Sequence, residues 1–182
     1  MLYSFRKRKP EVGKNTYVSE HALVIGNVVI GDSCYVGHGV ILRGDYGKIE
    51  IGAGTAIEEG VIIHAPPDGT CRVGKKVTIG HGAIVHASSI GDLTVIGMGA
   101  VISIYAEVGA ETIIAEGSIV KMRQIIPSGV VATGNPARVL GKVKEEQKAL
   151  WEYGKQLYID LAKEYLRDGM PELDSLNEET SS

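Results

Sequence analysis

The chain has 182 residues, which is enough for one domain with a substantial core. Its formal net charge is −3, so composition gives no reason to expect nucleic acid or an anionic membrane as a partner. Glycine is abundant, with 24 residues, while aromatic residues make up only 5%, a combination typical of many short strands joined by tight turns.

The N-terminal segment, MLYSFRKRKP, is basic and lacks the apolar stretch of a secretory signal. The sequence contains no run of about 18 apolar residues, so no membrane-spanning helix is expected. We therefore predict a cytoplasmic protein. The two cysteines, Cys34 and Cys71, do not form a CxxC pair, and we expect them to be buried thiols without a redox or metal-binding role.

An aliphatic residue recurs every six positions along most of the chain. The repeat keeps its phase over nineteen positions and shifts only three times, more regularity than chance alternation gives. The four blocks are Val12, Val18, Val24, Ile30, Val36 and Leu42; Ile51, Ile57 and Ile63; Val73, Ile79 and Val85; and Ile90, Ile96, Ile102, Val108, Ile114, Val120 and Ile126.

This six-residue period predicts an all-β fold, a parallel β-helix of hexapeptide repeats. Each unit contributes one short strand and a turn, and three units close a triangular coil with the aliphatic residue pointing inward. No coil buries its own apolar face, so the coils stabilise one another by stacking. Known hexapeptide proteins of this type are left-handed, and this resemblance predicts the same handedness here.

Two insertions shift the phase of the repeat, at residues 43–50 (RGDYGKIE) and 64–72 (HAPPDGTCR). Both leave the predicted β-helix from the same corner. Loops that depart from one place commonly shape a functional site, and we expect these two to do so.

The pattern changes after residues 134–137. Residues 144–167 are predicted to form an amphipathic helix with Leu150, Leu157, Leu161 and Tyr165 near one face. We therefore divide the chain into a hexapeptide-repeat domain at 1–140, a C-terminal helix at 141–170 that caps the same domain, and a polar tail at 171–182.

The repeat places chemically important side chains at one corner. The residue that follows the third inward position of each coil is Arg43, His64 and then His86 in successive coils. Stacked parallel strands lie about 4.8 Å apart, so His64 and His86 should be neighbours although 22 residues separate them. Two such imidazoles can share a metal ion at about 2.0–2.1 Å from each ring nitrogen.

A third histidine, His81, lies on the middle unit of the coil that carries His86. One prism cannot bring it to the corner of His64 and His86, but a threefold homotrimer can, by placing it against the neighbouring subunit. The sequence then predicts three equivalent metal sites at subunit interfaces. The alternative is that these histidines are ordinary turn or surface residues, as single histidines in a β-helix commonly are.

Several segments together resemble the gamma-class carbonic anhydrases. They are RGD at 43–45, His64 after its hexapeptide turn, GHGAIVH at 80–86, IGMGA at 96–100 and GNPAR at 134–138, and the resemblance covers residues 10–165. It implies that His64 and His86 bind a metal together with His81 of an adjacent subunit. The implied metal is zinc, with iron or cobalt as alternatives.

The resemblance also implies roles for other residues. Arg43 and Asp45 match a pair that connects subunits across the trimer interface, and Tyr158 resembles a tyrosine of the C-terminal helix that points toward the metal. The family's NxQD segment is replaced here by Ala56, Glu58 and Glu59. We expect Glu58, Glu59 or Tyr158 to orient the reacting water or to relay its proton.

The predicted function is the reversible hydration of carbon dioxide to bicarbonate. Water at the open fourth position of the metal has a lowered pKa, and the resulting hydroxide attacks carbon dioxide. Two alternatives remain: a coenzyme A-dependent acyltransferase or thioesterase that uses a histidine as base, and a non-catalytic trimeric scaffold with a vestigial metal site. Partners are therefore carbon dioxide or bicarbonate and two further copies of the chain, without nucleic acid or membrane.

Overall fold

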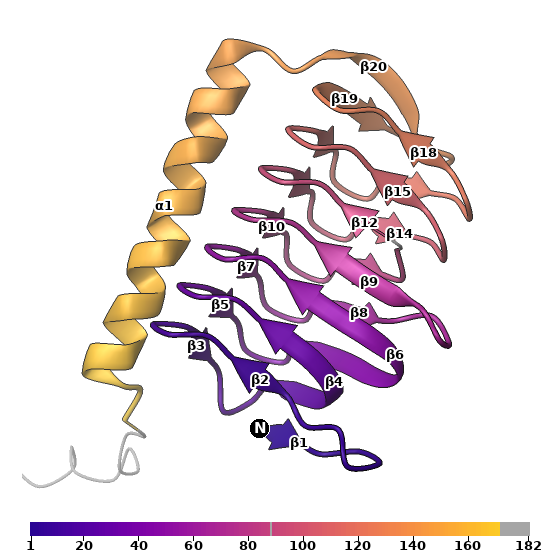
Figure 1. The fold of residues 1–182 in the computed structure, drawn as a ribbon. Helices are drawn as coiled ribbons and strands as arrows, with labels where there is room; N and C mark the ends of the chain where they lie inside the picture. The colour runs from indigo at the N-terminus through magenta and orange to yellow at the C-terminus, as the bar shows by residue number, and fades with distance from the viewer. Residues whose placement is uncertain (88, 172–182) are drawn as a thin grey trace, which may run out of the picture.

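A computed structural model describes residues 1–87 and 89–171 as a stack of parallel β-coils with one helix beside it (Figure 1). The prediction of a hexapeptide β-helix is confirmed. Of the predicted polar tail at 171–182, all but Pro171 lies outside the described residues. Within the described ranges, no helix is long and apolar enough to cross a membrane.

One face of the prism is a sheet of eight strands. Seven are parallel and the last is antiparallel and closes the sheet. In spatial order they are β3 (Tyr17–Val18), β5 (Tyr35–Val36), β7 (Ala56–Ile57), β10 (Thr78–Ile79), β13 (Val95–Ile96), β16 (Ile113–Ile114), β19 (Val130–Thr133) and β20 (Arg138–Lys142).

The other two faces form one sheet of twelve strands, because two long strands run around the corner between them. The long strands are β4 (Leu23–Ile30) and β6 (Ile41–Ile51). The face that carries the candidate site continues with β1 (Leu2–Tyr3), β8 (Ile62–His64), β11 (Ile84–Val85), β14 (Val101–Ile102) and β17 (Ile119–Val120). The remaining strands are β2 (Glu11–Val12), β9 (Thr70–Val73), β12 (Ser89–Ile90), β15 (Glu107–Val108) and β18 (Ile125–Ile126).

The expectation that residues 43–50 form a loop is wrong. This segment lies inside β6, where it pairs with β4 on one side and with β8 and β9 on the other. Residues 45–47 lie at a register shift where the strand turns the corner, and there the carbonyl of Asp45 accepts from Arg8 while the amide of Tyr46 donates to the carboxylate of Asp45. Only residues 65–69 of the second insertion leave the sheet, between β8 and β9.

The core consists of stacked inward side chains, as predicted. Seventeen of the nineteen repeat positions are buried; Val12 is 39% exposed and Val18 is half-buried. These two belong to the first coil, which has no complete coil beneath it to cover them. Cys34 and Cys71 are free and buried, as expected.

A second inward row, two residues before each aliphatic position, was not predicted. It holds small residues, among them Ala22, Cys34, Thr55, Ala83 and Ala100, all with no more than trace exposure. At Thr55 the hydroxyl donates to the carbonyl of Gly74 at 2.8 Å and accepts from the amide of Val77 at 3.1 Å. This bridge satisfies a buried backbone donor at the turn between two coils.

Replacing Thr55 by Val should lower the free energy of unfolding by about 1–3 kcal/mol, because the buried Val77 amide loses its acceptor. Thr55→Ser keeps the hydroxyl and should cost less. Urea unfolding followed by circular dichroism measures both changes. Equal stability of Thr55→Val and the wild type would show that the hydroxyl bridge contributes nothing.

The helix α1 (Glu145–Asp168) runs alongside the eight-stranded sheet and contacts β3, β5 and β7 (Figure 1). Its predicted limits are confirmed within one residue, but its predicted apolar face is partly wrong. Leu150 and Leu157 are 65% and 51% exposed. The sheet is instead covered by Lys155, Tyr158, Leu161, Ala162 and Tyr165, because tyrosines of β3 and β5 offer a stacking surface to the tyrosines of the helix.

Candidate metal centre

His64 and His86 lie side by side at one corner of the prism. β8 and β11 pair in register, with Ile63 opposite Val85, so the histidine that follows each of these residues occupies the same column. The two imidazole rings stack with centroids 4.8 Å apart and an angle of 28° between their planes. The juxtaposition predicted from the repeat is therefore present.

Both imidazoles have a buried nitrogen without a hydrogen-bond partner in the described chain, the Nε2 atom in each case. Burial lowers the pKa of His64, and the nearby guanidinium of Arg43 lowers it further. Burial also lowers the pKa of His86, assisted by His64 and Arg43. Both rings are thus held in the neutral form, which is the form that binds a metal ion.

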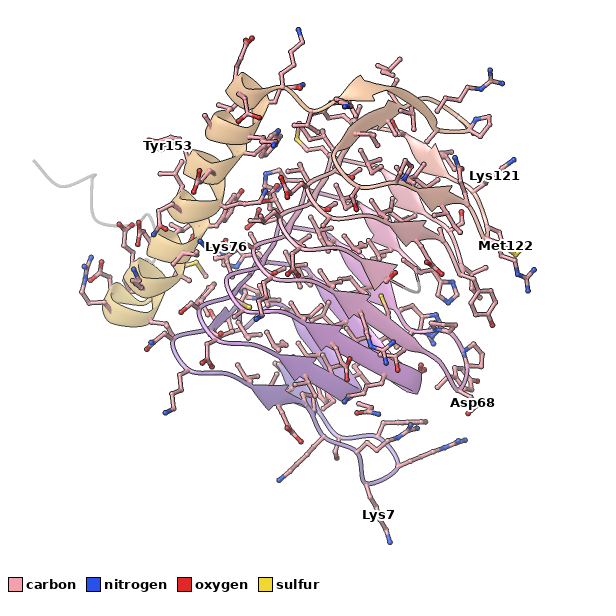
Figure 2. The ribbon with its side chains drawn as sticks, turned by 45° about the horizontal axis from the view of Figure 1, so that its top comes forward. Lys7, Asp68, Lys76, Lys121, Met122 and Tyr153 are labelled. Carbon is pink, nitrogen blue, oxygen red and sulfur yellow. The ribbon has the colours of Figure 1, made fainter. Side chains whose placement is uncertain are left out.

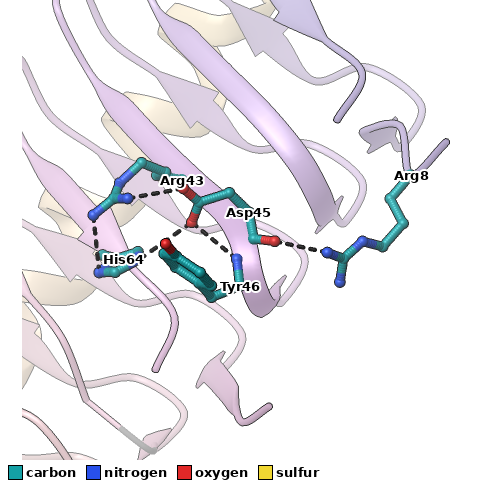
Figure 3. Close-up of polar contacts among 5 residues, drawn as sticks. All are labelled: Arg8, Arg43, Asp45, Tyr46 and His64. Atoms are coloured by element: carbon teal, nitrogen blue, oxygen red, sulfur yellow. Dashed lines mark hydrogen bonds and ion pairs between the residues drawn. The ribbon is translucent and has the colours of Figure 1, made fainter. Parts of the chain in front are cut away.

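Arg43 and Asp45 surround the outer side of His64 (Figure 3). Arg43 donates to an oxygen of Asp45 at 2.8 Å, and its guanidinium also lies 3.3 Å from Nδ1 of His64. The other oxygen of Asp45 lies 3.3 Å from Nε2 of His64, within ion-pair distance but without hydrogen-bond geometry. Arg43 and Asp45 thus pair with each other inside one chain; pairing across a trimer interface stays a prediction.

His81 lies at the other end of the same face, in the turn between β10 and β11. Its Nδ1 is 2.8 Å from the carboxylate of Glu59, and its Nε2 is 3.1 Å from that of Glu58. The carboxylate of Glu58 also accepts a hydrogen bond from the backbone amide of His81 at 3.1 Å. The structure does not bring His81 to His64 and His86 within one chain, and no group of three potential ligands forms in the described residues.

The two carboxylates that flank His81 have opposite properties. Burial raises the pKa of Glu58, although the charge of His81 and the hydroxyl of Tyr158 oppose the shift. Burial also acts to raise the pKa of Glu59, but a hydrogen bond from Tyr35 at 2.7 Å and the charge of His81 outweigh it, so this pKa is lowered. Glu58 is therefore the more readily protonated of the two carboxyl groups.

Tyr158 reaches this acidic pair from α1. Burial and the charge of Glu58 raise the pKa of its hydroxyl, which keeps Tyr158 protonated and able to donate. The ring of Tyr158 packs against that of Tyr35 of β5, with centroids 5.2 Å apart and a tilt of 50° between the planes. Residues predicted from sequence thus form two groups: His64, His86, Arg43 and Asp45 at one corner, and His81, Glu58, Glu59 and Tyr158 at another.

Three contributors were missed by the sequence analysis. Tyr35 donates a hydrogen bond to Glu59. Figure 3 shows the other two: Tyr46 packs edge-on against His64 at 6.4 Å, and Arg8 donates to the backbone carbonyl of Asp45 at 2.6 Å. The sequence held a signal for Tyr35, because this residue directly precedes the inward Val36 and therefore points outward, on the face that α1 covers. Arg8 is 37 residues from its partner and lies outside the repeat, so nothing in the pattern could place it.

The donor set fits a transition metal. Neutral imidazole nitrogens suit zinc, iron and cobalt, and the free Nε2 atoms of His64 and His86 supply two such donors at one place. Two protein donors are fewer than the three of a catalytic zinc site, so a third must come from elsewhere. His81, already oriented by a carboxylate as metal-binding histidines commonly are, has the required chemistry.

Comparison with curated proteins gives relatives of two kinds. The chain is 34% identical over 162 residues to gamma carbonic anhydrase 2, mitochondrial, of Arabidopsis thaliana, covering 86% of the chain and 58% of that protein. It is 35% identical over 159 residues to carnitine operon protein CaiE of Escherichia coli strain K12, covering 87% of the chain and 81% of CaiE. The chain therefore spans somewhat more than half of the plant relative. No protein-family model matches the chain.

Solved structures support the same architecture. A hexapeptide transferase family protein from Anaplasma phagocytophilum superposes with a TM-score of 0.86 at 32% identity, covering 91% of the chain and 98% of that protein. A putative acetyltransferase from Bacillus cereus superposes with a TM-score of 0.88 at 27% identity, covering 91% and 96%. Each comparison extends over the β-helix and not over a fragment of it.

Proposed function

The chain belongs to the hexapeptide-repeat family that includes the gamma carbonic anhydrases, and from this premise we propose that it is a homotrimeric, metal-dependent enzyme that hydrates carbon dioxide reversibly to bicarbonate. The observation that carries the proposal is the pair of stacked, neutral imidazoles of His64 and His86, each with a buried Nε2 that makes no hydrogen bond in the described chain. His81 of a neighbouring subunit completes the ligand set.

A metal ion held by three neutral imidazoles supplies Lewis acidity and lowers the pKa of a water molecule bound beside carbon dioxide. Zinc, iron and cobalt all suit these donors. The residues of the chain position the ligands. Glu59, held by Tyr35, fixes the ring of His81 through Nδ1, so Nε2 would be the nitrogen that holds the metal in place of its contact with Glu58.

Glu58 is then released for proton transfer. Its raised pKa and its contact with the hydroxyl of Tyr158 make it the group that accepts the proton lost during hydration and passes it toward solvent. Arg43 and Asp45 frame His64 on the opposite side and restrict its ring. If Nε2 of His64 held the metal, Nδ1 would carry the ring hydrogen, and Arg43 would keep its bond to Asp45 but lose its contact with Nδ1.

The face between the two groups supports a trimer. Its outward side chains form an aliphatic ladder in which each residue pairs in register with the next, and Ile62 and Ile84 are 38% and 44% exposed. This row lies beside the His64–His86 site, which needs a third metal-binding side chain. Packing of the same face of another subunit against the row would both cover the aliphatic side chains and supply His81. The ladder comprises Leu23, Ile41, Ile62, Ile84, Val101 and Ile119.

Ile84→Arg should weaken this trimer by at least about tenfold in its dissociation constant, because a charge replaces apolar area in the middle of the ladder. Light scattering should then show mass shifting from three times 19.4 kDa toward 19.4 kDa on dilution. Leu150→Arg places the same charge at an exposed position of α1 and serves as the control. An unchanged mass for Ile84→Arg would exclude this face as the interface.

The hydration activity is tested by stopped-flow assay on protein whose metal content has been quantified, purified without oxygen so that iron is retained. We expect one metal ion per chain. Hydration activity should disappear when the metal is removed by a chelator and return when zinc, iron or cobalt is added. Full activity in metal-free protein would exclude the mechanism. One bound metal per chain without hydration activity would instead support the non-catalytic scaffold.

A coenzyme A-dependent acyltransferase is the second candidate, favoured by the likeness to a hexapeptide transferase family protein and to a putative acetyltransferase. In that reaction a neutral imidazole of lowered pKa, such as that of His86, would act as general base. Calorimetric titration with acetyl-coenzyme A separates the two candidates. Micromolar binding would favour acyl transfer, and its absence would favour hydration.

A further inference from the structure

A cavity of about 220 Å³ lies between α1 and the eight-stranded sheet, on a different face of the prism from His64 and His86. Its walls are mainly apolar, and come from β13, β16, the segment before α1 and the first half of the helix. The apolar lining residues are Leu93, Val95, Ile113, Val143 and Trp151. Figure 2 shows Lys76 on the β-helix and Tyr153 on α1, and both line a second cavity that shares Leu93, Glu152 and Lys155 with the first.

Lys155 is the unusual member of this cavity. It is only 4% exposed, and its amine makes no hydrogen bond within the described chain. Its amine lies over the ring of Trp151, whose centroid is 5.7 Å from Nζ. A buried ammonium without a hydrogen-bond acceptor is costly, so the amine has an unused capacity to bind an anion.

The other charged residues at the cavity do not meet this need. Lys148 lies 3.4 Å from Glu111 and 3.3 Å from Glu145, so its charge is already paired. Glu152 also lines the cavity but forms no ion pair with Lys155 in the described residues. Among the described residues that line this cavity, Lys155 is therefore the one cation without an ion-pair partner.

Leu93 is a second indication that the cavity accommodates apolar groups. The turn position three residues before the inward residue of this sheet has positive φ in seven coils, and it is otherwise occupied by polar residues or glycine. Leu93 has φ +62° there and is 45% exposed at the cavity. An aliphatic residue is unfavourable in this backbone conformation. The equivalent residues are Asn15, Ser33, Gly54, Lys76, Glu111 and Gly129.

We propose that this cavity binds a small straight-chain monocarboxylate of about six carbons, with its carboxylate on Lys155 and its alkyl chain against Leu93, Ile113 and Trp151. Charge complementarity selects the carboxylate, and the apolar walls select the chain. The cavity is below the roughly 300–1,000 Å³ of pockets for drug-sized ligands, which sets the small size. The site is independent of the proposed metal centre.

The sequence provides a reporter, because Trp151 is the only tryptophan of the chain. Hexanoate should change its fluorescence in a saturable way at constant ionic strength and should raise the melting temperature. Hexanol has the same chain without the charge, and we expect at least tenfold weaker binding. Hexylamine, which carries the wrong charge, should not bind at all.

Lys155→Met removes the ammonium at similar volume and should weaken hexanoate binding at least tenfold while leaving hexanol binding unchanged. Lys163→Met removes an exposed lysine of the same helix and should change neither. Circular dichroism establishes that each variant is folded. The proposal is overturned by the absence of a saturable response to hexanoate, by equal affinity for hexanoate and hexanol, or by undiminished hexanoate binding in folded Lys155→Met.

Discussion

Two variants that are each inactive, His64→Ala and His81→Ala, are expected to recover about one quarter of the wild-type hydration activity when their subunits are mixed within trimers. Each site takes His64 and His86 from one subunit and His81 from the next. Every mixed trimer therefore contains one junction at which an intact pair meets an intact His81. Random assembly of equal amounts makes about three quarters of the trimers mixed, each with one working site in three.

The matched control is a mixture of His64→Ala with His86→Ala. Both substitutions damage the same half of the site, so no junction in any mixed trimer is complete, and activity should stay absent. The metal content should follow activity in both mixtures, which gives a second measurement. Equal recovery in the two mixtures, or none in either after wild-type subunits have reassembled by the same procedure, would contradict a site shared between subunits.

Lys155→Met should raise the free energy of unfolding by about 3 kcal/mol at pH 6.5. Burial lowers the pKa of Lys155 to about 8, whereas an unfolded lysine titrates near 10.4. Below pH 8 the folded chain holds a buried ammonium, so the native lysine destabilises the protein. Between pH 8 and 10.4 the folded state loses its proton first, and the penalty fades as pH rises.

The gain in stability from Lys155→Met should therefore shrink to about two fifths near pH 9.5 and approach zero above the unfolded pKa. Lys148, Glu111 and Glu152 surround the same cavity, but they are present in both proteins and cancel in the difference. Urea unfolding from pH 6.5 to 9.5 measures the effect, with Lys163→Met as the control at an exposed position. A pH-independent difference would show that packing, and not charge, is the cause.

The candidate site was partly accessible from the sequence. The column that unites His64 with His86 followed from counting six-residue units, because parallel coils in register bring equivalent positions together. The contact of His81 with both Glu58 and Glu59 was not foreseen, since it depends on side-chain directions in a turn. Tyr35 and Arg8 reach their partners from other coils, and no period in the sequence specifies those contacts.

The C-terminal helix was also predictable only in part. Its limits could be predicted because they depend on local pattern, but the side that it buries could not. Leu150 and Leu157 are exposed while Lys155 is buried, because the tyrosines of β3 and β5 set the rotation of α1. The strand through residues 43–50 is a similar case, since hydrogen bonds to β4, β8 and β9 decide its conformation.

The sequence by itself determined the β-helix, its core and the vertical neighbours at each corner, because a six-residue period with inward aliphatic residues has one way to bury them. The tertiary structure decided what no period encodes. It left Nε2 of two histidines without a hydrogen bond in the described part of the chain, turned Glu58 and Glu59 onto His81, and enclosed the amine of Lys155 under α1. These features depend on contacts between coils and between layers, which only the folded chain brings within reach.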